Sequence, residues 1–345
     1  MYISDFDYEL PPELIAQQPL AERAASRMLV VDRATQTWSD SQFDLFSDYL
    51  KANDALVLNN TRVFPARLAG ERWPSGGAME LLLIREVEPN LWETLARPAR
   101  RLRQGSRLVF GGSRLHAEVV ELLKDGMRLV KFESSESLDQ VIDDLGETPL
   151  PPYIKRDLGS DAQDKERYQT VYASQRGAIA APTAGLHFTP AVLRNVQARG
   201  VSITEITLHV GYGTFEPVRT SNVDHHRIAP EWSSVTDEAA GKINRARELG
   251  GRVVAVGTTT TRALEAAVGS DNRIGARSGF VDLTIVPGFG FRAVDGLLTN
   301  FHLPRSSLLM LVSAFAGREL ILAAYRHAVR EGYRFYSYGD CMLIR

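Results

Sequence analysis

At 345 residues the chain is longer than one hydrophobic core usually fills, so its length predicts about two domains. The apolar fraction of 44%, the charged fraction of 24% and the net charge of −2 fit an ordinary globular protein, and they neither require nor exclude a nucleic-acid partner, because a local basic face can bind phosphates. The single cysteine, Cys341, excludes an internal disulfide, and the lack of both an apolar run of ~18 residues and a basic signal-peptide start predicts a cytoplasmic protein with no membrane segment.

The first 60 residues are expected to form a turn, a helix and then a strand. Residues 55–58 are a continuous apolar run, which is typical of a strand buried on both faces of a sheet. Ligands of open α/β sheets bind at the carboxyl ends of the strands. The polar residues that follow this strand are therefore candidates for substrate binding: Asn59, Asn60, Thr61 and Arg62.

Residues 63–149 have a different pattern, with short strands separated by turns. Strands are expected at 79–84, 91–96, 107–110, 114–122 and 127–132, and a short helix at 137–145. This succession predicts a small barrel or sandwich inserted into the first domain. The expected fold class is therefore an α/β main domain with a mixed sheet, formed by 1–62 and 150–345, and an inserted all-β, barrel-like domain at 63–149.

From residue 150 onward helices and strands alternate. Thr189 and Thr236 are expected to cap helices, because a threonine hydroxyl accepts a hydrogen bond from a first-turn N–H. The expected elements are a helix from Pro190, a strand at 203–210, a helix ending at 250–251, a strand at 253–256, a helix from about Arg262, a strand at 281–286, helices around 306–316 and 320–328, and a strand at 334–338.

Three loops, 180–188, 207–215 and 298–304, combine a histidine with glycine, hydroxyl or amide residues. A single histidine in an apolar setting is most often a core residue, but three in matching loops also fit a common pocket, where imidazole acts as a base or stabilises developing charge. We take His187, His209 and His302 as candidate catalytic residues. The neighbouring candidates for substrate binding are Pro182, Thr183, Gly185, Gly211, Thr214 and Asn300.

Residues 257–261 follow a buried strand and are expected to form a loop before a helix. Such a loop presents backbone N–H groups to an anion. The segment lacks the P-loop lysine and the three-glycine dinucleotide pattern, so a carboxylate or a single phosphate is the favoured ligand, with Thr258 and Thr259 as binding residues. A threonine-rich helix cap is the equally good alternative.

The sequence offers poor ligands for a metal. There is one cysteine and no H-E-x-x-H motif, and His225 and His226 are adjacent, so they diverge on an extended chain. We expect no required metal. A serine triad is equally hard to assemble without a G-x-S-x-G motif.

Five arginines lie within residues 97–107 without an acidic residue among them. A charge run is usually a solvated face, but arginine used in preference to lysine fits phosphate contacts. The candidates for nucleic-acid binding are Arg97, Arg100, Arg101, Arg103 and Arg107.

Taken together, motifs along nearly the whole chain resemble the QueA family, the S-adenosylmethionine:tRNA ribosyltransferase-isomerases of the queuosine pathway. They are found at 14–17, 26–29, 58–63, 149–153, 167–173, 181–188, 207–215, 299–304 and 335–340. The resemblance implies an α/β domain with an inserted β-barrel. It also implies that S-adenosylmethionine donates its ribosyl group to 7-aminomethyl-7-deazaguanine at the wobble position of tRNA, giving epoxyqueuosine-tRNA, adenine and methionine. S-adenosylmethionine is consumed, no further cofactor or metal is implied, and we expect a monomer.

One segment departs from the family. The family usually reads His-x-Met-His-(Ser/Ala)-Glu, whereas residues 226–231 read His-Arg-Ile-Ala-Pro-Glu, so Ala229 replaces the second histidine. His226 and Glu231 remain candidates. The implied reaction begins when a base removes a proton from the ribosyl carbon next to sulfur, which requires imidazoles, carboxylates or amides.

Two other functions fit parts of the pattern. One is a non-catalytic RNA-binding protein, which adenine release would exclude. The other is a small-molecule enzyme that uses S-adenosylmethionine without RNA, which a requirement for tRNA would exclude.

Overall fold

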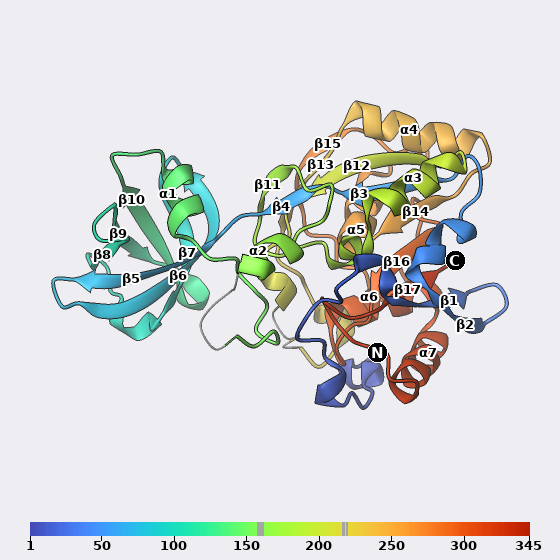
Figure 1. The fold of residues 1–345 in the computed structure, drawn as a ribbon, viewed down its shortest axis with the longest axis horizontal. Helices are drawn as coiled ribbons and strands as arrows, with labels where there is room; N and C mark the ends of the chain where they lie inside the picture. Colours follow the sequence, from blue (N-terminus) through green and yellow to red (C-terminus); the bar gives the residue numbers. More distant parts are fainter. Residues whose placement is uncertain (157–161, 216–217, 219) are drawn as a thin grey trace. The chain divides into compact units, whose positions relative to one another are not determined.

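The computed structural model describes residues 1–156, 162–215, 218 and 220–345. The chain divides into two compact units (Figure 1). The α/β unit contains Met1–Arg62, Pro152–Lys155 and Gln169–Arg345, and the barrel unit contains Val63–Pro151 and Arg156–Tyr168. The predicted fold class is confirmed, because one unit holds a large mixed sheet with helices and the other a closed antiparallel barrel.

The α/β unit is built on a nine-stranded sheet. Its four central strands, β12, β3, β14 and β16, run parallel, so their carboxyl ends meet at one edge, called here the carboxyl edge. The antiparallel neighbours β13 and β17 begin at this edge. In order across the sheet the strands are β15 (Arg277–Val281), β13 (Glu231–Val235), β12 (Ser202–Leu208), β3 (Ala55–Asn59), β14 (Val253–Val256), β16 (Gly296–Asn300), β17 (Cys341–Ile344), β1 (Arg27–Asp32) and β2 (Thr37–Gln42).

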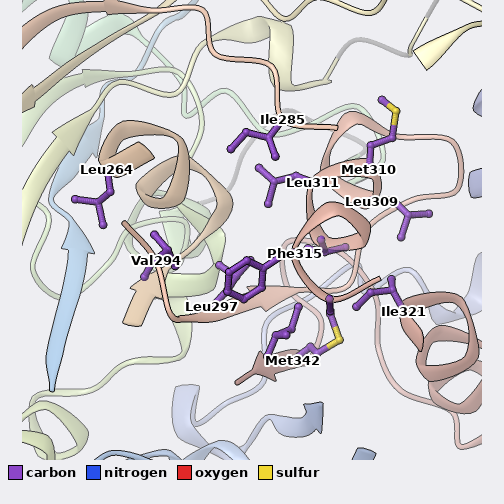
Figure 2. Packing of buried hydrophobic residues seen from close by; sticks show 14 of the residues in the cluster. Leu264, Ile285, Val294, Leu297, Leu309, Met310, Leu311, Phe315, Ile321 and Met342 are labelled. Atoms are coloured by element: carbon purple, nitrogen blue, oxygen red, sulfur yellow. The ribbon is translucent and has the colours of Figure 1, made fainter. Parts of the chain in front are cut away.

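Hydrophobic cores cover both faces of this sheet. Successive side chains of a strand point to opposite faces, and Val57 of β3 accordingly packs in the first core while Leu56 and Leu58 pack in the second. The first core includes residues of α4 (Asp237–Glu248), α5 (Thr258–Ala267), α6 (Ser307–Ala316) and α7 (Arg318–Arg330), and the second includes residues of η4 (Phe43–Tyr49) and α3 (Pro190–Ala198). Figure 2 shows α6 side chains of the first core close to Ile285 and Leu297.

The barrel unit closes six antiparallel strands on themselves. In β9 the side chains of Leu115, Ala117 and Val119 are buried while His116 and Glu118 are exposed, the alternation expected of a filled barrel. The strands are β10 (Met127–Glu133), β7 (Leu91–Arg97), β6 (Gly77–Glu88), β5 (Arg67–Trp73), β8 (Arg107–Phe110) and β9 (Leu115–Leu122), and the predicted helix is α1 (Leu138–Leu145). The sequence analysis missed β5.

Shorter elements complete the chain. They are β4 (Thr61–Val63), β11 (Gln175–Ala178), α2 (Ala162–Arg167) and the 3-10 helices η1 (Ile3–Phe6), η2 (Pro12–Leu14), η3 (Arg23–Ala25), η5 (Ala99–Arg101), η6 (Lys124–Gly126), η7 (Thr183–His187), η8 (Tyr212–Phe215) and η9 (Val223–His225). β4 and β11 pair as a separate two-stranded sheet.

The predicted helix caps are confirmed. Thr189 Oγ1 accepts a hydrogen bond from Val192 N at 3.2 Å at the start of α3, and Thr236 Oγ1 accepts one from Ala239 N at 3.2 Å at the start of α4. Each satisfies an N–H that the first turn would otherwise leave unpaired.

The expected loop at 257–261 is wrong, because α5 already begins at Thr258. β-Branched threonines are weak helix formers, which is why the sequence suggested a loop. In the structure Thr260 Oγ1 donates to Val256 O at 2.6 Å and Thr261 Oγ1 to Gly257 O at 3.2 Å, so these hydroxyls bond back to carbonyls four residues earlier.

Two expected strands are also wrong. The strand at 281–286 is instead β15, which ends at Val281, and the carbonyl of Leu283 accepts a hydrogen bond from Arg262 Nε at 3.1 Å rather than from a strand. The segment 334–338 is a turn, because Asp340 Oδ2 accepts from Arg334 N at 2.8 Å and Tyr336 has a φ of 72°; the terminal strand is β17. At the N-terminus, the expected helix is replaced by 3-10 turns and the β1–β2 hairpin.

Within the described ranges, no single helix has the length and apolar character needed to cross a membrane. The bent pair α6–α7 passes that test together, with 117° between the two axes.

Candidate functional site

Two amide side chains at the end of β3 join strand ends at the carboxyl edge. Asn59 Oδ1 accepts from Leu208 N at 2.9 Å, and its Nδ2 donates to Leu208 O at 2.9 Å, so Asn59 fastens β3 to the end of β12. Asn60 Oδ1 accepts from Thr207 Oγ1 at 2.7 Å. Arg62 is exposed. Asn59 and Asn60 therefore have a structural role at this edge, because both join the end of β3 to the end of β12.

His209 lies directly after β12 with a fixed ring. Its Nδ1 is hydrogen-bonded to Thr61 Oγ1 at 2.8 Å, and the ring stacks on Trp232 with centroids 5.0 Å apart. A Cβ added to Gly177 would lie 2.6 Å from His209 Nε2, so glycine is needed for this close approach. Burial lowers the pKa of His209.

His187 lies at the end of η7 and is buried against Phe43, with ring centroids 5.3 Å apart. Its Nδ1 is hydrogen-bonded to Ser26 Oγ at 2.9 Å, while the buried His187 Nε2 and Asn300 Oδ1 have no hydrogen bond of normal geometry to any residue that the structure describes. Burial lowers the pKa of His187 to about 4; the side chain of Asn300 opposes this shift, and the charges of Arg23 and Arg334 add to it. The fold thus brings the predicted residues His187 and Asn300 together, and the imidazole of His187 is neutral near pH 7.

The η7 loop needs its glycine. A Cβ on Gly185 would lie 2.1 Å from the hydroxyl oxygen of Tyr172, so a larger residue there would displace that side chain. Pro182 is buried at the N-cap of η7 and Thr183 is half-buried. The loop is therefore a tightly packed support for His187.

His302 has the contacts of a core histidine. Its Nε2 is hydrogen-bonded to Thr299 Oγ1 at 2.9 Å, its backbone N donates to the Tyr325 hydroxyl at 3.1 Å, and its carbonyl accepts from the Tyr8 hydroxyl at 2.5 Å. Burial lowers its pKa to about 3. Tyr325 belongs to the first core, whereas the Phe43 ring beside His187 belongs to the second, so His187 and His302 lie on opposite faces of the sheet.

A buried ion pair that the sequence analysis missed stands at the start of β13. Glu231 Oε2 accepts from Arg262 Nη1 at 2.5 Å, and Glu231 Oε1 accepts from Gly211 N at 2.8 Å. The pair therefore holds the turn after His209. Glu231 had been singled out only through the family motif and Arg262 only as a helix start, and no local pattern in the sequence joins the two residues.

Hydroxyls and an aromatic ring complete the edge. His226 Nε2 is hydrogen-bonded to Ser307 Oγ at 2.7 Å, and burial lowers the pKa of His226. Thr258 and Thr259 are buried in the first turn of α5, with Thr259 Oγ1 3.4 Å from Asn59 Nδ2. Thr214 lies in η8, and its side chain is outside the described part of the chain. Ser26 and Trp232, which hold His187 and His209, were not predicted as site residues.

The five predicted RNA-binding arginines lie on the barrel unit. Arg97 ends β7, Arg100 and Arg101 lie in η5, Arg103 follows in a turn and Arg107 begins β8. All five are exposed, and none of them forms an ion pair with another residue that the structure describes. Their charges are therefore available to a partner.

Across the described residues, no group of three histidine, cysteine, aspartate or glutamate side chains is placed to hold a metal ion. The absence of a required metal stays a prediction.

The fold defines the class: a two-unit α/β protein with an inserted β-barrel and polar side chains at one edge of its large sheet. A family model described as "Queuosine biosynthesis protein" matches residues 3–344. The S-adenosylmethionine:tRNA ribosyltransferase-isomerases of Desulfitobacterium hafniense and Halothermothrix orenii are 50% and 48% identical to this chain, over 100% of each chain. The crystal structure of S-adenosylmethionine tRNA ribosyltransferase from Thermotoga maritima is similar with a TM-score of 0.57 and 38% identity, over 99% of this chain and 100% of that one. The chain belongs to the queuosine biosynthesis protein family and is an enzyme, as the resemblance predicted.

Proposed function

We propose that the protein transfers and isomerises the ribosyl group of S-adenosylmethionine onto 7-aminomethyl-7-deazaguanine at the wobble position of tRNA. The observation that carries the proposal is the full-length similarity to two relatives named for this activity. The products are epoxyqueuosine-tRNA, adenine and methionine. The proposed reaction takes place on tRNA, and we propose that the enzyme acts in the cytoplasm as a monomer.

The reaction moves protons at several steps. A base takes the proton from the ribosyl carbon next to sulfur, adenine leaves, the aminomethyl nitrogen attacks, and closure of the epoxide expels methionine. A neutral imidazole suits the first step, since it accepts a proton without first losing one. His187 fits this role best among the three candidates, because its Nε2 has no hydrogen bond of normal geometry within the described residues and Ser26 fixes its ring.

The roles of the other candidates follow from their places. We propose that the polar residues at the carboxyl edge bind and orient the two substrates, as ligands of open α/β sheets usually bind there. The exposed arginines of the barrel unit would hold tRNA through its phosphates.

The test is an assay of the purified chain with S-adenosylmethionine and tRNA bearing the aminomethyl base. Adenine and methionine should be released and the tRNA mass should rise by the transferred group, with no loss of activity after prolonged EDTA treatment. Turnover without tRNA would favour the small-molecule enzyme, and tRNA binding without adenine release would favour the non-catalytic binder. Activity lost with EDTA and restored by one metal would contradict the metal-free expectation.

A further inference from the structure

The two ends of the barrel differ in charge. Because neighbouring strands run antiparallel, the turns 74–76, 98–106 and 123–126 all lie at one end, called here the basic rim. The five exposed arginines of 97–107 are in or beside the middle segment. Arg85 and Arg114, which lie toward the other end, are paired with acidic side chains. The barrel therefore gathers arginines that are available to a partner at the basic rim.

A buried arginine holds the backbone of this rim. Arg128 is 8% exposed, and it donates from Nε to Leu102 O at 2.9 Å and from Nη2 to Ala99 O at 2.8 Å. Its Nη1 donates to Gly126 O at 2.7 Å. One guanidinium group thus ties the η5 segment to the turn 123–126. The segment that carries the exposed arginines is therefore ordered before a ligand binds, which lowers the entropy cost of binding.

An exposed tryptophan lies on the same rim. Trp73 is the last residue of β5 and is 64% exposed, whereas tryptophan is usually well buried. It lies directly opposite Arg107 of β8, so the two side chains point to the same face of the ladder. The adjacent pair is Arg72 and Leu108, and Leu108 is buried inside the barrel, so Trp73 and Arg107 point outward. The rim thus places a flat apolar ring beside a guanidinium group.

We infer that the basic rim binds unpaired nucleotides of RNA, with one base stacked on Trp73 and the neighbouring phosphates held by the arginines. The inference rests on the proposed function, which supplies an RNA substrate, and it adds a residue and a mode of binding. Phosphate contacts alone fit paired and unpaired RNA alike. An aromatic ring on the protein surface can stack only on a base that is free of its own helix, because bases within a duplex already stack on one another.

The Trp73→Ala variant tests the inference with two probes, a tRNA transcript and a blunt-ended RNA duplex that has no unpaired base. Loss of the ring should raise the Kd for tRNA at least ~5-fold, the lower end of what one stacked base contributes, and leave the Kd for the duplex unchanged. The salt dependence of tRNA binding should keep its wild-type slope, because no phosphate contact is lost. Trp73→Phe keeps an aromatic ring and should recover most of the affinity.

Val87→Ala is the matched control. Val87 is also an exposed apolar residue of the barrel unit, but it lies near the other end of β6, so its loss should change neither Kd. A folded Trp73→Ala protein that binds tRNA like the wild type overturns the inference. An equal loss of duplex binding also overturns it, as does a change in oligomeric state with unchanged tRNA binding, which would assign Trp73 to a protein contact.

Filter binding measures both Kd values without turnover, so the two proposals can fail separately. A wild type whose tRNA binding depends on Trp73 but which releases no adenine refutes the proposed function alone. Normal adenine release by the wild type, with unchanged tRNA binding in Trp73→Ala, refutes the stacking inference alone.

Discussion

Burial keeps the imidazoles at the carboxyl edge neutral near pH 7. It lowers the pKa of His187 to about 4 and that of His302 to about 3, and it also lowers the pKa of His209 and His226. A neutral imidazole is ready to accept a proton, but its lowered pKa makes it a weaker base. Proton removal at this edge therefore depends on position more than on basicity.

The first prediction concerns the catalytic base. Alanine in place of the active histidine among His187, His209 and His302 should lower turnover ~10²–10⁴-fold with little loss of tRNA affinity. If His187 is the base, turnover of the wild type should stay flat as the pH falls from 8 and drop only as it approaches the pKa of about 4. Single-turnover rates across pH measure both effects, and near-normal rates in all three variants would remove these histidines from the mechanism.

The second prediction concerns stability. Folding lowers the pKa of His187 and His302, so below the unfolded value of about 6.5 the unfolded chain binds more protons than the folded one. The free energy of unfolding should therefore be constant above pH ~7.5 and fall below ~6.5, by up to ~1.4 kcal/mol per pH unit for each histidine. Urea unfolding from pH 8 to 5 measures this, and a His187→Gln variant that keeps the full slope would argue against the assignment.

Sequence reasoning singled out the candidate histidines but not the residues that hold them. His187 could be singled out from its loop, whereas its partner Ser26 is 161 residues away in sequence. Trp232, which stacks on His209, and Arg262, which pairs with Glu231, also lie outside the local sequence window of their partners. Such contacts depend on which strands become neighbours, and local patterns carry no information on that.

Helix starts were predictable because their chemistry is local. The capping hydroxyls of Thr189, Thr236 and Ser306 each bond a backbone N–H three residues ahead, so a short window of sequence contains both partners. The start of α5 was missed because Gly257 offers no capping side chain and threonines fill the first turn.

The third prediction tests a cap. Thr236→Ala should lower the free energy of unfolding by ~1 kcal/mol, since Ala239 N loses its hydrogen-bond acceptor. Thr236→Ser keeps the hydroxyl and should stay within ~0.5 kcal/mol of the wild type. Urea unfolding of the three proteins measures the difference; equal losses in both variants would show that the hydroxyl does not provide the stabilisation.

The mispredicted strands depended on distant residues. The segment 334–338 is rich in aromatic side chains like a strand, but Asp340 accepts from both Arg334 N and Arg27 N and fixes a turn there. Phe335 is then buried against Phe301 and Tyr325 in the first core. Its backbone pairing is limited to one isolated bridge between Phe335 and Ile15, so the aromatic residues reflect burial rather than a strand.

For the whole molecule, the change from helix-and-strand alternation to short strands was enough to predict an inserted barrel. The order of the large sheet was not predictable, because β3 pairs with β12 and β14, which lie more than 140 residues later in the chain. The carboxyl edge and the candidate site on it can be located only once the order of the strands is known.

The last prediction concerns the exposed arginines of the barrel unit. Arg100, Arg101 and Arg103 lie in η5 and the turn after it, without an ion-pair partner among the described residues, so their guanidinium groups are available to phosphates. Phosphate contacts position RNA without reading its sequence, and removing one such contact should reduce the salt dependence of binding by ~0.7 units of slope. Replacing the three arginines by glutamine should therefore weaken tRNA binding and flatten that slope by up to about two units.

Affinity for S-adenosylmethionine should not change in the triple variant, since the three arginines belong to the barrel unit and the candidate substrate-binding residues at the carboxyl edge to the α/β unit. Arg85→Gln with Arg114→Gln is the matched control, because these exposed arginines of the same unit are already paired with Glu93, and with Glu136 and Asp144. Filter binding of tRNA across salt concentrations distinguishes the two variants. A folded triple variant with the wild-type slope would reduce the arginine run to a solvated face.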